Sequence, residues 1–436
     1  MQKACVHGGN MKKTISIVIA GAGGRGFLAY APYTKKYPEK MKLVGVAEPD
    51  DFRRARIREE YGLAEEQCFS DAKQLFAVPR MADIAFICTQ DRQHVEHALL
   101  AMRQGYDILL EKPVSPYADE CRRLYRAACG CGALVTVCHV LRYAPFYRKI
   151  KELLERGAIG EIISIQAAEN VGYWHYTHSY VRGKWRNSKE TSPMILAKCC
   201  HDMDLFVWLT ESRCQTISSM GALTYFREKN APCGAPGHCM QGCPKKSDCP
   251  FDAEKIYLTN AVNASGQNGT DWMQREVCGA RGEACLREAL YDGPYGRCVF
   301  RCDNDVVDHQ VVCARMENGV TISFSMCGFH EKNYRTIHIM GTAGELYGTM
   351  EEDRLILQPF GQEAVEVMTA AEGDEKSHGG GDDQMMEDLY EAATEGGATL
   401  TGLGDSLESH YMALAAEESR MEGGKKIELQ KFRMQG

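Results

Sequence analysis

The sequence lacks the features that are typical of membrane proteins and of nucleic-acid-binding proteins. It contains no run of eighteen apolar residues, so no transmembrane helix is expected. It has no long basic run and no interleaving of basic and aromatic residues, and its formal net charge is −8. These absences argue against nucleic acid and membranes as partners. No internal repeat is present, and 436 residues are enough for two or more domains.

Signals for export are also lacking. The segment that begins at Met11 resembles a signal peptide, but its apolar run is short and leads into glycines without a clear cleavage site. We expect a strand there, with residues 1–10 as a disordered extension. Twenty cysteines in a chain of this length do not indicate a small disulfide-bonded scaffold, and a reducing, cytoplasmic location is expected.

A glycine pattern near the amino terminus carries the first functional signal. Residues 14–20 form an apolar run typical of a buried parallel strand, and Gly21-x-Gly23-x-x-Gly26 follows it directly. A helix is expected over 25–36 and a second strand over 42–48, which ends in Glu48, 22 positions after Gly26. This succession predicts a dinucleotide site in which the Glu48 carboxylate binds a ribose hydroxyl.

The same carboxylate bears on the choice of cofactor. Its charge would repel a 2′-phosphate, so NAD is favoured over NADP. Arg53, Arg54 and Arg56 could instead accommodate that phosphate, but we interpret them as the solvated face of the next helix.

Strands and helices alternate through the first part of the chain. Strands are expected at 82–89 and 107–113, with a helix at 94–105 between them. This alternation predicts an α/β fold with a doubly wound Rossmann domain over residues 11–140. Residues 141–436 are expected to form a second, α+β domain, because their strands are separated by loops.

Four short motifs together resemble those of the Gfo/Idh/MocA oxidoreductases. They are the glycine loop, Thr89 with His94 after the fourth strand, Glu111-Lys112-Pro113 after the fifth, and His201-Asp202-x-Asp204. The resemblance implies a Rossmann domain followed by a domain with an open-faced, largely antiparallel sheet, residues 141–436 here, for substrate binding and oligomerisation. It also implies a tightly held nicotinamide cofactor, a sugar or polyol substrate, and assembly into homodimers or tetramers.

The resemblance also implies a set of cofactor contacts, with two departures from the family pattern. Gln90 stands where the family commonly has proline, and Ala197 stands where it has aspartate, with Lys198 one place later. The expected cofactor-binding residues are Gly21, Gly23, Gly24, Arg25, Gly26, Glu48, Thr89, His94, Glu111 and Lys112.

Lys112 and His201 are the candidates for handling the substrate proton, with Lys198 as an auxiliary. A free lysine has a pKa near ~10.4, so action as a base at neutral pH needs a shift of about three units. Lys112 could instead be a permanently charged donor that only orients a hydroxyl. His201 titrates near neutrality without such a shift, and Asp202 or Asp204 could orient it. The sequence leaves open which residue is the base.

An aromatic-rich segment, 170–187, supplies the candidate substrate pocket. Aromatic rings stack on the apolar faces of sugars, and Arg and His donate to hydroxyls or a carboxylate. The alternative is a loop that packs a subunit interface. Together with residues that follow the last Rossmann strand or belong to the second-domain motif, the candidates are His139, Arg142, Tyr143, Tyr173, His175, His178, Arg182, Trp185 and Asp204.

A cysteine-rich loop at 230–251 is a candidate structural zinc site. Its four cysteines are Cys233, Cys239, Cys243 and Cys249, of which only the middle pair has a spacing that suits zinc well. His238 is an alternative ligand, Cys298 with Cys302 is another possible pair, and reduced thiols without metal are the main alternative.

These residues predict an NAD-dependent oxidoreductase that transfers hydride between nicotinamide and a ring hydroxyl carbon of a sugar, glycoside or polyol. One alternative is a glycoside hydrolase that uses the same hydride chemistry transiently, by oxidation at C3, elimination and re-reduction. A second alternative is a non-catalytic sensor that binds nicotinamide or sugar.

Overall fold

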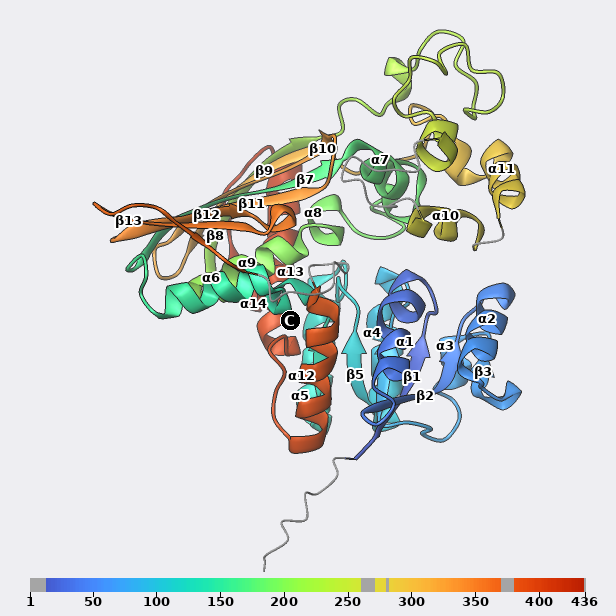
Figure 1. Cartoon of the computed structure of the whole chain (residues 1–436), viewed down its shortest axis with the longest axis horizontal. Helices are drawn as coiled ribbons and strands as arrows, with labels where there is room; N and C mark the ends of the chain where they lie inside the picture. The colour runs from blue at the N-terminus through green and yellow to red at the C-terminus, as the bar shows by residue number, and fades with distance from the viewer. Residues whose placement is uncertain (1–12, 260–270, 280–281, 370–379, 435–436) are drawn as a thin grey trace, which may run out of the picture.

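The computed structural model describes residues 13–259, 271–279, 282–369 and 380–434 (Figure 1). The extension predicted for residues 1–10 lies outside these residues. Within them, the strands form two sheets, one of six strands and one of nine. No helix in the described ranges is long and apolar enough to cross a bilayer.

The first sheet is the predicted doubly wound sheet. Its strands are all parallel and lie in the order β3-β2-β1-β4-β5-β6, which is the order of a dinucleotide-binding fold. The apolar runs form these strands because helices cover both faces of the sheet. The strands are β1 (Ile15–Ala20), β2 (Met41–Ala47), β3 (Cys68–Phe69), β4 (Ile84–Ile87), β5 (Asp107–Leu110) and β6 (Val135–Val137).

The helices of the first domain match the expected alternation. The segment predicted as one helix over 25–36 begins instead as a π-helical turn, η1 (Gly24–Tyr30), and continues as α1 (Ala31–Lys36). The remaining helices are α2 (Asp51–Tyr61), α3 (Ala72–Leu75), α4 (His94–Arg103) and α5 (Ala118–Cys131).

The second sheet is largely antiparallel, as predicted. Its order is β14-β13-β12-β11-β7-β10-β9-β8-β15, and only β7 and β10 pair in parallel among its described strands. The strands are β7 (Ile162–Gly172), β8 (Cys214–Ala222), β9 (His309–Met316), β10 (Thr321–His330), β11 (Tyr334–Gly341), β12 (Gly344–Thr349), β13 (Arg354–Pro359), β14 (Val365–Val367) and β15 (Ile427–Glu428).

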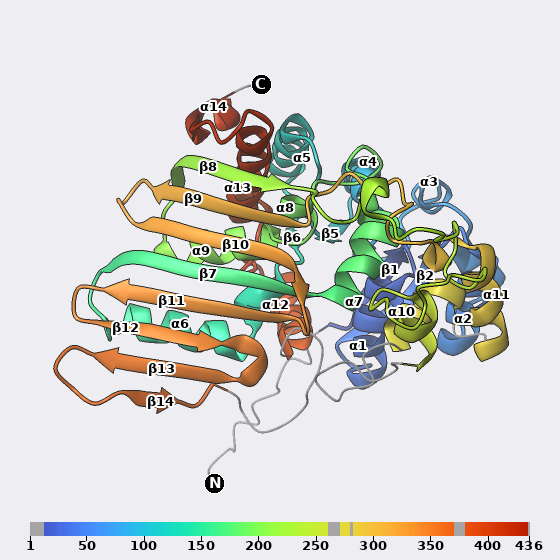
Figure 2. The ribbon, with the colours of Figure 1, turned by 90° about the horizontal axis from the view of Figure 1, so that it is seen from above.

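One face of this sheet is covered by helices and the other is open (Figure 2). Side chains along β9 alternate between buried or half-buried and exposed positions, which is the period of a sheet with one packed face. The helices of this domain are α6 (Pro145–Glu155), α7 (Tyr173–Tyr176), α8 (Met194–Ala197), α9 (Cys200–Thr210), α13 (Leu403–Met421) and α14 (Leu429–Met434).

A late segment of the chain returns to the first domain. Helix α12 (Gly381–Glu395) buries Met385, Met386 and Leu389 in a core made otherwise by Rossmann residues. The main-chain nitrogen of Val137, in β6, then donates to the carbonyl of Thr401 over 2.9 Å. The predicted division at residue 140 therefore does not capture this segment, which completes the first domain from the far end of the sequence.

A long insert, residues 223–308, separates β8 from β9. It contains α10 (Asp271–Cys278) and α11 (Glu283–Asp292), which pack with Ile256 and Tyr257 in a small core of their own. In Figure 1 these helices lie on the same side of the molecule as α2 and α3. The insert thereby forms a second wall beside the carboxyl ends of the Rossmann strands.

The packing of α12 can be tested by truncating one of its buried side chains. Leu389 is 0% exposed, so Leu389→Ala should lower the free energy of unfolding by about 2–5 kcal/mol, measured from denaturant titration. The exposed Glu391 lies on the same helix, and Glu391→Ala should change stability by less than about 0.5 kcal/mol. Equal effects of the two changes would contradict this packing.

Candidate active site

A cavity of about 290 Å³ lies at the carboxyl ends of the first sheet. Ligands of open α/β sheets bind at this edge. Turns that follow β1, β2, β4 and β5 form one side, and the insert forms the other. The lining includes Gly21, Gly23, Gly24, Arg25, Glu48, Thr89, His94, Glu111, Lys112, Trp185, Trp272, Arg275 and Glu276.

The three glycines of the motif meet three different requirements. Gly21 has a φ of +94°, and a Cβ there would lie 2.4 Å from the carbonyl oxygen of Cys88. A Cβ on Gly26 would lie 2.2 Å from the carbonyl oxygen of Gly21, so this glycine allows the helical turn to pack on the strand. Gly23 has open space where its Cβ would be. This arrangement fits the close approach of a pyrophosphate to the backbone.

Glu48 is fixed at the edge of this loop. Its carboxylate is 6% exposed and accepts hydrogen bonds from the main-chain nitrogens of Ala22 (2.7 Å) and Asp50 (3.1 Å). A carboxylate held in this position is suited to accept a ribose hydroxyl. Arg54 donates to the carbonyl of Glu48 over 2.6 Å and does not line the cavity. Arg53 and Arg56, interpreted from the sequence as part of a solvated helix face, do line the cavity.

Arg25 and Glu111 form a partly buried ion pair in the wall of the cavity. Arg25 Nε lies 2.8 Å from Glu111 Oε1, and its Nη2 lies 2.5 Å from Oδ1 of Asp382 on α12. Burial opposes ionisation of Glu111, but the charges of Arg25 and Lys112 outweigh it and hold the pKa of Glu111 below its ordinary value. The guanidinium of Arg25, expected to bind cofactor, is thus also a link between the glycine loop and the returning helix.

Lys112 is placed by the turn after β5. Its Nζ donates to the carbonyl oxygen of Ala197 over 3.0 Å, and its main-chain nitrogen donates to Glu111 Oε2 over 3.0 Å. The imidazole of His94 contacts the carbonyls of Thr89 (3.0 Å) and Pro113 (2.7 Å), so it joins the turns after β4 and β5. The predicted cofactor residues of both turns therefore meet at one end of the cavity.

His201 lies one helical turn beyond the carbonyl that Lys112 contacts. Its ring is edge-on to His139 at a centroid distance of 5.7 Å, and His139 is in turn edge-on to His410 at 5.5 Å. Burial, with the positive charges of Arg142 and Lys112, holds the pKa of His139 well below its ordinary value. Lys112 and His201 thus border one buried group of imidazoles, although His201 does not itself line the cavity.

A buried ionic network lies under Lys198. Lys198 Nζ is 3.3 Å from Glu169 Oε1, and Arg335 joins Glu169 (2.5 Å) to Asp202 (3.0 Å). Burial raises the pKa of Asp202 to about 6 against the opposing charge of Arg335. Glu169 and Arg335 carry no local motif, so sequence analysis missed them.

Comparison with known proteins covers both domains. A model described as "Oxidoreductase family, NAD-binding Rossmann fold" matches residues 15–139, and its companion, "Oxidoreductase family, C-terminal alpha/beta domain", matches residues 151–429. Oxidoreductase YteT of Bacillus subtilis is 24% identical over 392 residues, which cover 86% of this chain and 88% of YteT. An inositol 2-dehydrogenase of Rubrobacter xylanophilus is 25% identical over 214 residues, 48% of this chain and 56% of that enzyme.

A solved structure extends the likeness to the whole fold. The inositol dehydrogenase homolog from Azotobacter vinelandii, complexed with NAD+, is similar with a TM-score of 0.69 and 13% identity, over 96% of this chain and 98% of that one. The two family models together match well over half of this sequence. The chain belongs to the Gfo/Idh/MocA oxidoreductase family. It is an NAD-binding oxidoreductase, and the open glycine loop and fixed Glu48 fit that cofactor.

Several residues of this oxidoreductase that were predicted to contact substrate form hydrogen bonds with other groups of the protein. Arg142 makes two hydrogen bonds to Asp204, of 2.7 and 2.6 Å, and a third to the carbonyl of Leu400. The hydroxyl of Tyr143 donates to Asp388 over 2.6 Å. These buried residues, and His139 beside them, do not line the cofactor cavity. We interpret Arg142, Tyr143 and Asp204 as ties between the two domains.

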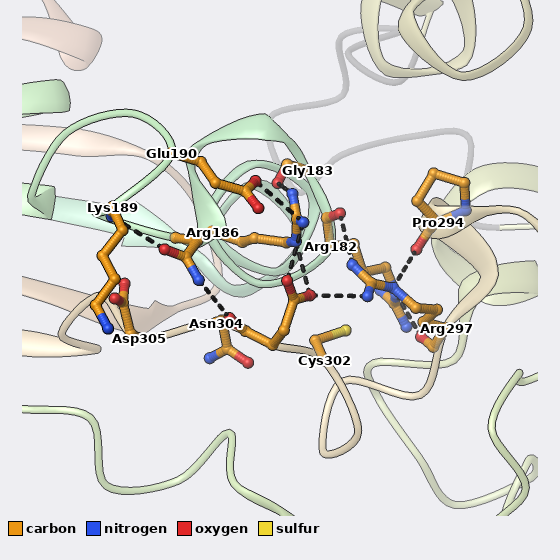
Figure 3. A network of polar contacts seen from close by, with 12 residues as sticks. Arg182, Gly183, Arg186, Lys189, Glu190, Pro294, Arg297, Cys302, Asn304 and Asp305 are labelled. Atoms are coloured by element: carbon orange, nitrogen blue, oxygen red, sulfur yellow. Dashed lines mark hydrogen bonds and ion pairs between the residues drawn. The ribbon is translucent and has the colours of Figure 1, made fainter. Parts of the chain in front are cut away.

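The aromatic segment divides into two groups. Trp185 lines the cofactor cavity, and Tyr173 and His175 are half-buried on the same helical segment. His178 and Arg182 face the insert instead: His178 contacts the hydroxyl of Tyr257 at 2.8 Å, and Arg182 donates to the carbonyl of Arg297 over 2.8 Å. Figure 3 shows Arg182 and Arg186 extending toward the segment around Arg297 and Asn304. Of the five predicted substrate residues in this segment, Trp185 is the one that lines the cofactor cavity.

The insert contributes cavity residues that sequence analysis did not identify. Trp272 on α10 is edge-on to His178 (4.9 Å) and His175 (5.4 Å). Burial opposes ionisation of Glu276, but Lys184 and His178 hold its pKa well below the ordinary value. No motif marks these residues, because they reach the cavity only through the packing of the insert.

The zinc site predicted on Cys233, Cys239, Cys243 and Cys249 is not supported in that form. Within the described ranges, no group of three or more His, Cys, Asp or Glu side chains stands ready to hold a metal ion. Cys233 is exposed, whereas the other three cysteines line a small cavity together with Cys298. The fold therefore does not bring the four predicted ligands together.

The role of Glu48 can be tested by removing its charge while keeping its shape. Glu48→Gln should weaken NAD binding about tenfold, because the amide keeps one acceptor oxygen, so that one of the hydrogen bonds from the main chain of Ala22 and Asp50 becomes neutral and the other is lost. It should also shift the affinity ratio toward NADP. Calorimetric titration with both cofactors measures the two effects, and Glu59→Gln, at an exposed position of α2, is the matched control. An unchanged ratio would contradict the assigned position of Glu48.

The buried His410 predicts a pH dependence of stability. Its Nδ1 donates to the carbonyl of Ser406 (2.9 Å) and its Nε2 accepts from the main chain of Val114 (2.8 Å), which fixes the neutral form. Burial and the neighbouring His139 lower the pKa of His410 to about 3. The unfolded chain binds this proton near pH 6.5, so the free energy of unfolding should fall as the pH decreases below about 6.5.

Denaturant titration across this range measures the effect. His410 should contribute up to about 1.4 kcal/mol per pH unit between its two pKa values. His410→Asn should flatten the dependence by that amount. Identical slopes for wild type and variant would show that His410 is protonated in the folded protein.

Proposed function

We propose that this oxidoreductase transfers a hydride between NAD and a ring hydroxyl carbon of a sugar or polyol. The observation that carries the proposal is the position of Lys112, which lines the same cavity as the glycine loop and Glu48. A bound nicotinamide supplies the hydride acceptor or donor at this end of the cavity. The inositol dehydrogenase among the relatives supports a cyclic polyhydroxylated substrate.

In this proposal Lys112 and His201 have separate roles at the hydroxyl that is oxidised. The Nζ of Lys112 donates to the carbonyl of Ala197, which leaves its remaining protons for the oxygen that is oxidised. A cation at that oxygen favours the alkoxide that develops as hydride leaves. His201, whose ring lies beside the imidazole of His139, is assigned to accept the hydroxyl proton. Asp202 follows it directly in the chain and is held by Arg335.

Lys198 follows Ala197, which stands at the position of the family's aspartate, and is the auxiliary residue of this proposal. It is only 16% exposed and is paired with Glu169, so its position is fixed before a ligand arrives. Trp185, Tyr173 and His175 supply the apolar and polar surfaces for a sugar ring. This assignment places the substrate between the turn after β5 and the aromatic segment.

The proposal is tested by kinetics on a panel of free sugars, inositols and nitrophenyl glycosides. Reduced nicotinamide should accumulate with at least one of them. Lys112→Met should lower kcat by about 10²–10⁴-fold while the protein still binds NAD, and Lys189→Met, at an exposed position, should have no effect. The formation of reduced nicotinamide and the release of nitrophenol are measured together in the same reaction.

The outcomes separate the alternatives. Nitrophenol release without net reduction would replace the proposal with a redox-neutral glycosidase. Full activity in Lys112→Met would remove Lys112 from the chemistry. Binding of NAD and sugars without turnover by either channel would favour a sensor.

A further inference from the structure

A second, much smaller cavity lies inside the insert. Its volume is about 20 Å³, which is room for a single water-sized ligand or ion. Cys239, Cys243, Cys249 and Cys298 all line it, and the rest of the wall is largely proline, alanine, valine and phenylalanine, with Lys245 and Asp252 at its edge. Four thiols around one enclosed space of this size are more than a packing requirement explains.

The backbone brings these cysteines together from two distant segments. The main-chain nitrogen of Cys239 donates to the carbonyl of Gly296, and that of Cys298 donates to the carbonyl of Gly237, each over 2.9 Å. Cys243 and Cys249 follow Cys239 in consecutive tight turns. Residues 231–252 contain no regular helix or strand, and the backbone hydrogen bonds within this loop are those of its turns.

A buried arginine beside the thiols is the second observation. Arg182 is 1% exposed, and its Nη2 donates to the carbonyl of Phe251 over 2.6 Å and lies 3.6 Å from Sγ of Cys239. Its Nη1 is buried without a hydrogen-bond partner. Among the described residues no carboxylate lies within ion-pairing distance of its guanidinium, which Figure 3 shows between its own helical turn and Arg297.

This charge is uncompensated as long as the thiols are neutral. A buried guanidinium without an anion is costly, because it loses its hydration and gains no opposite charge. Four thiols that bind a divalent cation release four protons, and the resulting tetrathiolate carries two negative charges. Such a site would compensate the charge of Arg182 and accept hydrogen bonds from it through sulfur.

We propose that Cys239, Cys243, Cys249 and Cys298 bind one zinc ion as thiolates, with Arg182 donating to the coordinating sulfurs. The side chains do not yet converge in this structure, so binding requires their rotation into the cavity. Zinc accepts four thiolates in tetrahedral geometry and needs no redox partner. The space suits one ion and is too small for an iron–sulfur cluster.

The proposed ion has a structural purpose. It would fasten residues 239–249 to residue 298, which lie on opposite sides of α10 and α11 in the sequence. Helix α10 carries Trp272, Arg275 and Glu276 into the wall of the cofactor cavity. The inference is independent of the proposed substrate, because it concerns how the insert is held in place.

Metal analysis of the purified full-length chain tests the proposal. The protein, incubated with zinc chloride and desalted, should contain about one zinc per chain by mass spectrometry. Cys298→Ser should lose this zinc, although Cys298 lies outside the cysteine-rich loop. Cys233→Ser is the matched control: it changes a cysteine of that loop that is exposed, and it should keep the metal.

A spectroscopic measurement covers the case in which Cys298→Ser does not fold. Wild-type protein loaded with Co²⁺ should show the intense visible bands of a tetrahedral tetrathiolate, displaced by added Zn²⁺. Absence of both zinc and these cobalt bands in folded wild-type protein would overturn the proposal, as would zinc retained by Cys298→Ser but lost by Cys233→Ser. Bound iron with a visible chromophore would replace it with a cluster.

Discussion

The active site depends on the ion pair and the hydrogen bond that the buried carboxylate of Glu111 makes. It pairs with Arg25 of the glycine loop through one oxygen and accepts the main-chain nitrogen of Lys112 through the other. The side chain of Glu111 is 7% exposed and that of Arg25 is 29% exposed, so removal of Arg25 would leave a buried carboxylate without this partner. The loop that receives the cofactor and the lysine proposed to touch the substrate are therefore positioned by one group.

The same pair extends to the far end of the chain. Arg25 also binds Asp382 on α12, and the turn after Pro113 is fixed by His410 on α13. Late segments of the sequence thus complete the first domain and set the geometry of its catalytic turn. On the other side of the cavity, the insert supplies α10 as a wall, so the cofactor site is built from three separated parts of the chain.

A part of the site could be predicted from the sequence when its signal lies within one short segment of the chain. The glycine loop, Glu48 and the Glu-Lys-Pro turn were predictable because each motif carries its own backbone requirement, such as the positive φ of Gly21. The second-domain histidine was found through the family resemblance. Arg142 and Asp204 were predicted as substrate contacts, yet they bind each other, because sequence alone does not reveal which polar groups pair.

Residues that reach the site through contacts between distant parts of the chain could not be predicted from the sequence. Glu169 and Arg335 lie on strands that are neighbours only in the folded sheet. Trp272 reaches the cavity through an insert with no recognisable motif, and Cys298 joins the cysteine cavity through two hydrogen bonds between distant loops. For Glu169, Arg335 and Cys298 the burial of a charge or thiol in the structure indicates the role, whereas Trp272 is identified by its place in the cavity wall.

The most direct test of the account follows one hydrogen atom. A substrate identified in the sugar and inositol panel would be prepared with deuterium on the carbon that is oxidised, and the NADH formed would be analysed by mass spectrometry and NMR. The account predicts that the deuterium is found on C4 of the nicotinamide ring. Deuterium released to water, with unlabelled NADH, would contradict direct hydride transfer at this site.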